Sequence, residues 1–207
     1  MLFRSVFAAV DGGAADCGVL PIENSIGGSI HRNFDLLLEH QLPIVGEVEV
    51  PVVHHLLALP GRSLAHVRRI YSHPQALAQC DRFLRTLSGV EIVATYDTAG
   101  SAKMIRDQQL ADAAAIASAR AAEVFGLEPI RSAIQDYDNN TTRFLVMARE
   151  ADWPKDDGRR FITSFLYRVR SVPASLYKSL GGFATNGINL TKLESYMVDG
   201  LFEAAQF

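Results

Sequence analysis

Residues 17–29 read CGVLPIENSIGGS, and this stretch carries the strongest local signal in the sequence. The apolar run at 17–22 has the length of a buried β-strand. A polar cluster follows at 23–25, and a Gly-Gly pair at 27–28 frees the backbone to aim several N–H groups at one point. A helix is predicted directly afterwards, at 29–40, from its apolar spacing. A strand, a polar turn and a helix in this order favour a bound anion, although a turn that only caps the helix would have the same composition.

The same alternation of strands and helices continues through the first 148 residues. It predicts a mostly parallel α/β architecture, in which sites lie beyond the carboxyl ends of strands, where loops meet the N-termini of helices. The predicted strands are 17–22, two within 43–59 that join around Pro51, 68–72, 91–95, 113–117 and 141–148. The predicted helices are 29–40, one that begins near Pro74, 98–108, and one that runs from Ser118 to Gly126.

Composition excludes several classes of partner. Apolar residues make up 48% of the 207 residues and charged residues 21%, a balance that supplies a hydrophobic core. The net charge of −3 leaves no basic surface for nucleic acid, and the apolar stretches are too short and interrupted for a membrane-spanning helix. We therefore expect neither nucleic acid nor a membrane as a partner.

Cysteines and histidines indicate no metal site. Cys17 and Cys80 form no CxxC pair and have no histidine at ligand spacing, so two reduced thiols are predicted, with a structural disulfide as the alternative. His54 and His55 are adjacent, and on a strand they would face opposite sides. No P-loop, GxGxxG or Ser-His-Asp order is present either.

Two further polar turns follow predicted strands. The first is SHPQ at 72–75, where Ser72 or His73 would cap the next helix, and Gln79 lies one turn past Gln75 on the same helix face. Both amides would then reach one ligand. The second is DTAGS at 97–101, with Thr98 as the predicted N-cap and Ser101 one turn later. For each turn, a purely structural capping role is an equal alternative.

The fourth polar segment, NNTTRF at 139–144, begins the last strand of this region. Thr142 and Arg143 are neighbours there, and neighbours on a strand face opposite ways. One of them would face a cleft and the other would form a structural ion pair, and an ordinary surface strand is the alternative. Together the four segments predict a site lined by hydroxyls, amides, a carboxylate and one or two cations, which binds a small anionic metabolite.

The pattern changes after residue 149. Residues 150–160 are polar, contain Pro154 and Gly158, and are predicted to be a linker. Beyond it a strand is predicted at 161–169, a helix at 173–185, and two strands at 188–197 and 201–207. This β-α-β-β order matches the first four elements of a ferredoxin-like unit.

The motifs themselves are more specific than the pattern. GVLPIENSIGGSIHRNFDLL, YSHPQALAQC, DTAGSA, ASARAAEVFGL, IQD and NNTTRFLVMAR occur in this order. In order and spacing they resemble the prephenate dehydratase family, which includes the plant arogenate dehydratases. The segment GINLTKLES resembles the ACT-type regulatory domain that follows in that family.

The resemblance implies a fold and a division into domains. The catalytic domain, residues 1–149, would be a two-lobed α/β domain like a type II periplasmic binding protein, with an active site between the lobes. One lobe would hold residues 1–52 with the return strand at 141–149, and the other residues 53–135. Residues 150–160 would be the linker, and 161–207 an incomplete α+β ferredoxin-like ACT domain.

The resemblance also implies a reaction and roles for the site residues. The family converts prephenate to phenylpyruvate with loss of water and CO₂, without a cofactor, in phenylalanine biosynthesis. The threonine of the family's TRF motif matches Thr142, whose hydroxyl would assist departure of the ring hydroxyl, and Arg143 would bind a carboxylate or organise the cleft. By the same likeness Glu23 and Asn24 would be catalytic, and the substrate would be bound by Ser25, Ser72, Gln79, Thr98 and Ser101.

Two alternatives to this function remain open. The same cleft would serve a non-catalytic module that binds an amino acid or an aromatic acid, and fold alone does not separate the two. Arogenate, which carries an amino group where prephenate has a keto group, is the alternative substrate. Prephenate is favoured because the sequence opens without a recognisable transit peptide, which makes the cytoplasm the expected location, or the plastid if the chain comes from a plant.

The resemblance implies regulation by L-phenylalanine and assembly into a homodimer or homotetramer. The residues that would bind phenylalanine are Pro173, Ala174, Leu176, Asn189, Leu190, Glu194 and Ser195. Ala174 stands where the family has a glycine, in a turn that usually reads PGAL, and ESYM at 194–197 replaces the usual ESRP. These departures put the regulation in question.

Family members carry a strand and a Gly-rich segment before the position of Met1, and a further helix and strand after that of Phe207. We therefore expect the 207-residue chain alone to be poorly soluble or molten, with little activity, because a strand edge without its neighbour exposes unpaired backbone.

Overall fold

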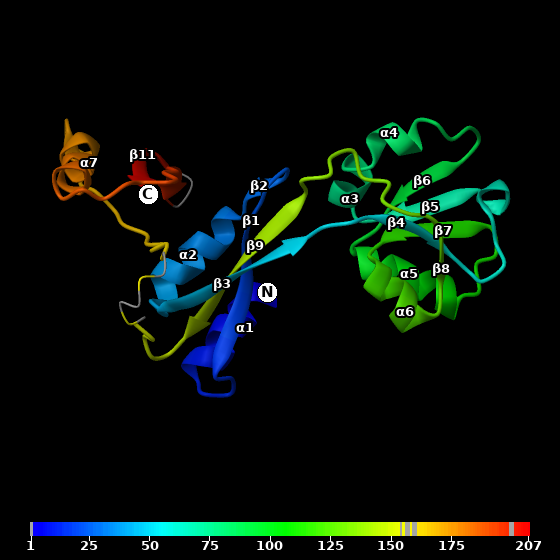
Figure 1. The fold of residues 1–207 in the computed structure, drawn as a ribbon, viewed down its shortest axis with the longest axis horizontal. Coiled ribbons are helices and arrows are strands. Elements are labelled where there is room, and N and C mark those ends of the chain that lie inside the picture. Colours follow the sequence, from blue (N-terminus) through cyan, green and yellow to red (C-terminus); the bar gives the residue numbers. More distant parts are fainter. Residues whose placement is uncertain (1, 154, 156–157, 159–160, 199–200) are drawn as a thin grey trace. The chain divides into compact units, whose positions relative to one another are not determined.

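The computed structural model describes residues 2–153, 155, 158, 161–198 and 201–207. Two units pack separately: one contains residues 1–22, 29–48 and 144–207, and the other residues 23–28 and 49–143. Apart from the short segment 23–28, the chain thus enters the second unit near the end of β3 (Ile44–Pro51) and returns to the first within β9 (Thr141–Ala148). Figure 1 traces this path by colour from blue to red.

The first unit is built on a four-stranded sheet with the strand order β2-β1-β9-β3. Alternation along β1 (Cys17–Asn24) buries every second residue, Leu20 and Ile22 among them. The helices α1 (Leu2–Asp11) and α2 (His31–His40) are amphipathic and supply Phe7, Val10, Leu36 and Leu37 to the same core. The short strand β2 (Gly28–Ser29) completes the sheet.

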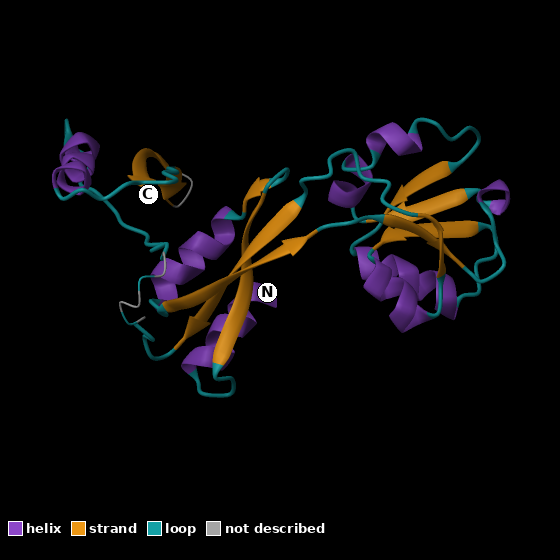
Figure 2. Cartoon of the chain, in the orientation of Figure 1, coloured by secondary structure: helices purple, strands orange, loops and turns teal. Residues whose placement is uncertain are grey.

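The second unit has a five-stranded sheet in the order β6-β5-β7-β4-β8. The central strand β7 (Ala113–Ala117) is buried along its whole length, and its residues alternate between two cores, one on each face of the sheet. Figure 2 shows helices on both faces of this sheet. The strands around β7 are β4 (His55–Ala58), β5 (Arg69–Ser72), β6 (Glu91–Ala94) and β8 (Glu128–Arg131).

This sheet is mixed, which corrects the prediction of a mostly parallel arrangement. β5 runs parallel to β6 and β7, but β4 pairs antiparallel with both β7 and β8. The reversed strand is β4, whereas β8, a short strand that the sequence pattern did not predict, lies beside β4 and runs in the same direction as β5, β6 and β7. Because β5, β6 and β7 are parallel, the turns after them share one edge of the sheet.

Helix caps in the second unit follow local sequence. Pro74 occupies the first turn of α3 (Pro74–Ala78), which is capped by His73 and is followed by α4 (Asp81–Leu84), where a single helix was predicted. Ser118 caps α6 (Ala119–Phe125), and Gly126 ends it in the left-handed conformation, as the sequence predicts. The N-cap of α5 (Thr98–Asp107) is Asp97, so the prediction of Thr98 is wrong by one residue. The remaining short element is a 3-10 turn at Leu64–His66.

The C-terminal segment contains α7 (Ser175–Thr185) and an antiparallel pair, β10 (Tyr196–Val198) and β11 (Leu201–Gln206). Residues 161–169 form only an isolated bridge, and 188–195 are irregular, so the strand predicted at 161–169 is wrong and the one at 188–197 is confined to its end. The aromatic rings of Phe165, Tyr167 and Phe183 lie against one another. Part of the expected linker lies outside the described residues.

In the described part of the chain, no helix has the length and apolar character needed to cross a membrane. The same residues contain no group of three or more His, Cys, Asp or Glu side chains placed to hold a metal ion. Cys17 is exposed and Cys80 is buried, and both are free thiols.

Candidate active site

The amide of Asn24, at the end of β1, is the centre of the site. Its Oδ1 accepts hydrogen bonds from the backbone N–H groups of Ile26 and Gly27 at 3.0 and 2.6 Å. Its Nδ2 lies 3.0 Å from Thr142 Oγ1, 2.8 Å from Asn140 Oδ1 and 3.2 Å from the Thr141 carbonyl. Since a backbone N–H only donates, the oxygen of this amide must face the turn and the NH₂ group must face β9.

This orientation decides what the Thr142 hydroxyl can do. The Asn24 NH₂ group donates to Thr142 Oγ1, so the hydroxyl oxygen is an acceptor in that bond. No other side-chain bond of Thr142 occurs among the described residues. Its own hydrogen is therefore available to a bound molecule, which makes Thr142 a hydrogen-bond donor at the site.

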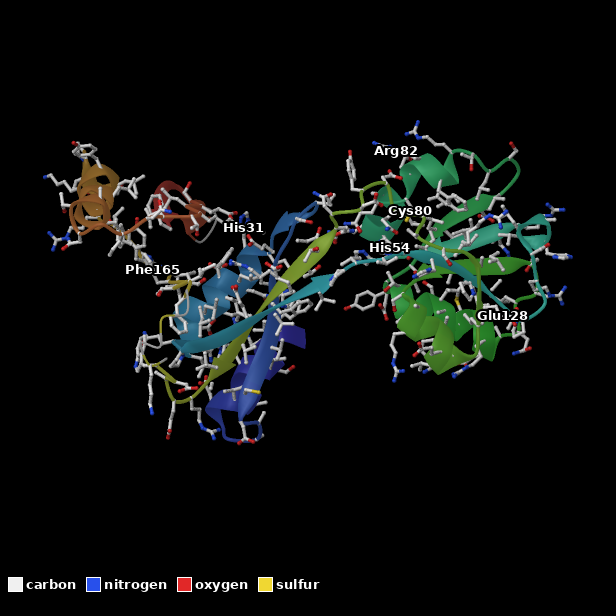
Figure 3. The ribbon with its side chains drawn as sticks, viewed as in Figure 1. His31, His54, Cys80, Arg82, Glu128 and Phe165 are labelled. Carbon is white, nitrogen blue, oxygen red and sulfur yellow. The ribbon has the colours of Figure 1, made fainter. Side chains whose placement is uncertain are left out.

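A second amide pair extends the site toward α3. Asn140 Nδ2 donates to Gln79 Oε1 at 3.0 Å, and His54 Nε2 lies 2.9 Å from the same oxygen. Asn140 is 3% exposed and His54 6%, so this network is largely screened from water. His54 is labelled in Figure 3, at the start of the five-stranded sheet.

The Ser25 side chain forms hydrogen bonds with the nearby backbone. Its hydroxyl donates to the Asn139 carbonyl at 2.7 Å and accepts from the Thr141 N–H at 2.9 Å. The Ser25 N–H also donates to the Thr141 carbonyl. Ser25 therefore joins the end of β1 to the beginning of β9, and in this way it holds Asn24 and Thr142 beside each other.

Glu23 and Arg143 form an ion pair beside this group, with Arg143 Nε 2.9 Å from Glu23 Oε1. Each side chain is a little over one-fifth exposed. Thr142 thus faces the Asn24 amide while Arg143, its neighbour on the strand, faces a carboxylate. This division between the two residues is one of the interpretations that the sequence allowed.

The loop after β1 also lies against α3. A Cβ built on Gly27 would overlap Gln75 Nε2 and would lie 3.3 Å from Asn24 Oδ1. Any side chain at this position would therefore displace the Gln75 amide and crowd Asn24. The first glycine of the Gly-Gly pair thus serves to bring the loop and the SHPQ turn together.

Three predicted substrate-binding residues have local structural roles here. Ser72 is fully buried, and its hydroxyl donates to the Ile116 carbonyl of β7. Ser101 is 2% exposed and donates to the Asp97 carbonyl, with Thr95 Oγ1 2.5 Å away. Thr98 is the first residue of α5 and is half-buried. The structure does not join these three residues to the Asn24 network.

Asn140 and His54 are members of the network that the sequence analysis did not single out. Asn140 lies in the NNTTRF motif, but the sequence analysis assigned roles there only to Thr142 and Arg143. His54 was considered only as half of a His-His pair. Their burial was the missing signal, because polar side chains that are fully buried are almost always hydrogen-bonded to a partner.

The predicted phenylalanine-binding residues fall into two groups. Pro173, Ala174 and Leu176 line a cavity of about 450 Å³ together with Tyr177, Phe207 and neighbouring residues of 169–175. Of the second group, Asn189 and Ser195 are exposed and Leu190 is half-buried, and none of the group, Glu194 included, lines this cavity.

Glu194 instead binds the N-terminal part of α2. Its carboxylate accepts from Ser29 Oγ at 2.5 Å and lies 2.8 Å from His31 Nε2 and 3.1 Å from Lys192 Nζ. Burial opposes ionisation of this carboxyl, but the three hydrogen-bonding partners outweigh it and lower its pKa to about 2.

Comparisons with known proteins bear on the family of the chain. The prephenate dehydratase family model matches residues 1–152. Arogenate dehydratase/prephenate dehydratase 6, chloroplastic, of Arabidopsis thaliana is 52% identical over 194 residues, which are 93% of this chain and 47% of that protein. The chain therefore spans about half the length of the plant relatives that it matches.

Two other relatives are covered more fully. The bifunctional N-acyl-homoserine lactone acylase/prephenate dehydratase of Komagataeibacter europaeus is 45% identical over 205 residues, which are 99% of this chain and 73% of that protein. The crystal structure of prephenate dehydratase in complex with L-Phe from Arthrobacter aurescens superposes with a TM-score of 0.81 at 29% identity, over 98% of this chain and 67% of that one. With a family model over most of its length and relatives near half identity, the chain belongs to the prephenate dehydratase family.

Proposed function

We propose that the chain is a lyase that converts prephenate to phenylpyruvate in phenylalanine biosynthesis. The observation that carries this function is the Thr142 hydroxyl, held as an acceptor by the Asn24 NH₂ group at 3.0 Å and so left with its hydrogen for a ligand. Membership of the family and the names of the relatives support the same reaction.

The reaction needs little chemistry from the protein beyond such a donor. The bond between the ring and its carboxyl group breaks, CO₂ departs, and the electron pair enters the ring as the ring carbon–oxygen bond breaks. The leaving oxygen takes up one proton and departs as water, and the ring becomes aromatic. A hydroxyl placed where negative charge develops on that oxygen lowers the barrier, and removal of such a group typically costs about 10²–10⁴ in rate.

Arg143 is proposed to assist through its charge. Its guanidinium pairs with Glu23, so the free site carries a neutral pair instead of a bare cation. A substrate carboxylate would compete with Glu23 for the guanidinium or share it, which is possible because Arg has several donors in a fixed fork. Gln79 would contribute its NH₂ group, since its Oε1 is engaged by Asn140 and His54.

The test is formation of phenylpyruvate, followed by its absorbance in alkali. The 207-residue chain and a version extended at both ends with the segments that the resemblance implies are both assayed. We expect Thr142→Val, which keeps the shape of the side chain but removes the hydroxyl, to lower kcat by about 10²–10⁴, while Thr142→Ser retains much more of the activity. Equal rates for Thr142→Val and the wild type would remove Thr142 from the mechanism, and no product from either version would favour a binding module.

Substrate choice is tested in the same assay with arogenate. We propose prephenate as the preferred substrate, although the named plant relatives include arogenate dehydratases. A clearly higher kcat/KM on arogenate would reverse this choice.

Hydrolysis of N-acyl-homoserine lactones is a second candidate, favoured by the name of the Komagataeibacter relative. Amide hydrolysis by a threonine needs an adjacent base. The neighbour that Thr142 Oγ1 has among the described side chains is the Asn24 amide, which cannot accept a proton in that role. We therefore rank this activity below dehydration, and release of homoserine lactone from an acylated substrate would raise it.

The organisation of the whole protein is proposed as follows. Residues 1–149 form the catalytic domain, 150–160 a linker, and 161–207 part of an ACT-type domain that binds L-phenylalanine, the ligand with which the Arthrobacter relative was crystallised. The cavity beside Pro173 and Ala174 supports such a ligand. We further propose a homodimer or homotetramer located in the cytoplasm, whereas the Arabidopsis relatives are named as chloroplastic proteins.

A further inference from the structure

We propose that Asn140 is a positioning residue for this reaction: it holds the Asn24 amide so that the Thr142 hydroxyl presents its hydrogen to the substrate. The proposal rests on the function proposed above. Asn140 does not contact Thr142 through its side chain in this structure. It acts through Asn24, whose Nδ2 makes its shortest contact, 2.8 Å, with Asn140 Oδ1.

The geometry at Asn24 explains why such a residue is needed. Two backbone N–H groups hold the Asn24 oxygen, but the two hydrogens on Nδ2 face three acceptors, on Asn140, Thr141 and Thr142. The Asn140 oxygen takes one of these hydrogens and sets the plane of the amide. The other hydrogen is then directed at β9, where Thr142 Oγ1 lies 3.0 Å away.

Asn140 is in turn held by a chain of hydrogen bonds in which the donor and the acceptor of each bond can be assigned. Because its Oδ1 accepts from Asn24, its Nδ2 must donate, and the recipient is Gln79 Oε1. Gln79 Oε1 is therefore an acceptor for His54 as well, so His54 must carry a hydrogen on Nε2. Donation thus runs from the 26–27 backbone through Asn24 and Asn140 to Gln79 Oε1. That oxygen also accepts from the imidazole, so no atom has conflicting roles.

Burial makes this chain rigid. Asn140 is 3% exposed and His54 6%, and a buried polar group without a partner is costly, so each member constrains the next. The chain carries orientation and not protons, since three of its members are neutral amides. Its effect on the reaction should therefore appear in kcat, through the placement of Thr142, more than in KM.

A double-mutant cycle tests this role in whichever of the two protein versions is active. We expect Asn140→Ala to lower kcat about 10–100-fold, the loss typical of a residue that orients a functional group, with KM changed by less than about threefold. In a Thr142→Ala background the same substitution should change kcat by less than about twofold, because the hydroxyl that it positions is absent. Equal losses of kcat in both backgrounds would overturn the proposal and leave Asn140 with a structural role.

Asn139→Ala is the matched control. It removes the same side-chain amide from the neighbouring, exposed position, where only the backbone carbonyl is used, by Ser25. Its kcat should equal that of the wild type.

If Asn140→Ala fails to fold, Asn140→Asp replaces it in the cycle. The new carboxylate still accepts from Asn24 but no longer donates to Gln79, so its orientation is less well fixed. We again expect a loss of kcat only where the Thr142 hydroxyl is present. A loss of the same size in the Thr142→Ala background would overturn the proposal.

A second measurement needs no variant and no turnover. The ¹⁵N and ¹³C resonances of the imidazole distinguish its tautomers, and we expect the neutral His54 ring to carry its hydrogen on Nε2. A hydrogen on Nδ1 alone would break the chain at Gln79 and overturn the proposal. A wild-type protein with the Nε2–H tautomer but no turnover of prephenate or arogenate would instead refute the proposed function, so the two failures are distinguishable.

Discussion

Ala174 adopts a backbone conformation that favours glycine. It is the N-cap of α7, with φ of 64° and ψ of 10°, in the left-handed region. That conformation places Cβ close to the following carbonyl oxygen. The turn thus holds an alanine in a conformation that favours glycine, the residue that the resemblance to the family implies at this position.

Ala174→Gly should therefore stabilise the protein. Relief of the left-handed conformation is worth about 1–2 kcal/mol, and the greater freedom of glycine in the unfolded chain offsets about 0.5–1 kcal/mol of it. A net gain of about 0.5–1 kcal/mol in the free energy of unfolding is expected, measured by urea denaturation. Ala184→Gly, in the last turn of α7, is the control and should destabilise by up to about 1 kcal/mol. A loss of stability in Ala174→Gly would show that the alanine methyl makes a contact that outweighs the strain.

At the scale of elements, the packing of α1 against β1 depends on a glycine. A Cβ on Gly18 would lie 2.9 Å from Val6 Cγ1 and 3.1 Å from Val10 Cγ2. Both neighbours belong to α1, and Val10 is fully buried. Helix and strand therefore approach more closely at this point than any larger residue permits.

Gly18→Ala should force these elements apart. Overpacking of a buried contact typically costs about 1–3 kcal/mol, and we expect a loss of that size in the free energy of unfolding. Gly182→Ala provides a comparison, since a Cβ there meets nothing within 4 Å and alanine is the better helix former by about 1 kcal/mol. If Gly18→Ala left the free energy of unfolding unchanged, α1 would have to shift on the sheet at no cost.

The elements also show how much of the fold could be predicted from the sequence. Strands were predictable where they contain a run of apolar residues, which fills 113–117 and follows the polar residues 141–143 in 141–148, and these ranges coincide with β7 and β9. β8 was missed because EPIR, at 128–131, is half polar and contains a proline. The strand predicted at 161–169 failed because apolar alternation alone does not supply a partner strand, and pairing is decided by tertiary structure.

The sequence also predicted part of the candidate site, namely which polar residues lie at the ends of strands. Polar residues after one predicted strand and at the start of another indicated Asn24 and Thr142, and the structure joins them. Ser72 and Ser101 have the same kind of position, but their hydroxyls bind backbone carbonyls close by. A sequence pattern places a side chain at a sheet edge and does not say which way its hydroxyl turns.

At the scale of the whole molecule, stability should depend on pH through His55. Burial, and next the charge of His54, lower the pKa of His55 below its ordinary value of 6.5, and its Nδ1 is buried without a partner. The unfolded chain therefore binds this proton first as pH falls. The contribution to stability is complete above pH 6.5 and is lost as pH falls from there through the lower pKa of the folded state.

The measurement is the free energy of unfolding between about pH 7.5 and 5, on the wild type and on His55→Gln. The decline with falling pH over that interval should be shallower in the variant, because glutamine has no proton to take up. Identical slopes for His55→Gln and the wild type would assign the pH dependence to other groups.

The insertion of the second unit into the first has a consequence for synthesis on the ribosome. β9 lies between β1 and β3 in the sheet, yet it emerges last of the three, after all of residues 49–140. The residues of both cores of the second unit therefore emerge before β9, the central strand of the first unit. Nascent chains arrested when residue 140 has emerged from the ribosome and β9 has not should therefore hold a protease-resistant second unit and a protease-sensitive first one, and Asn24 would meet Thr142 only when the final strand enters the sheet.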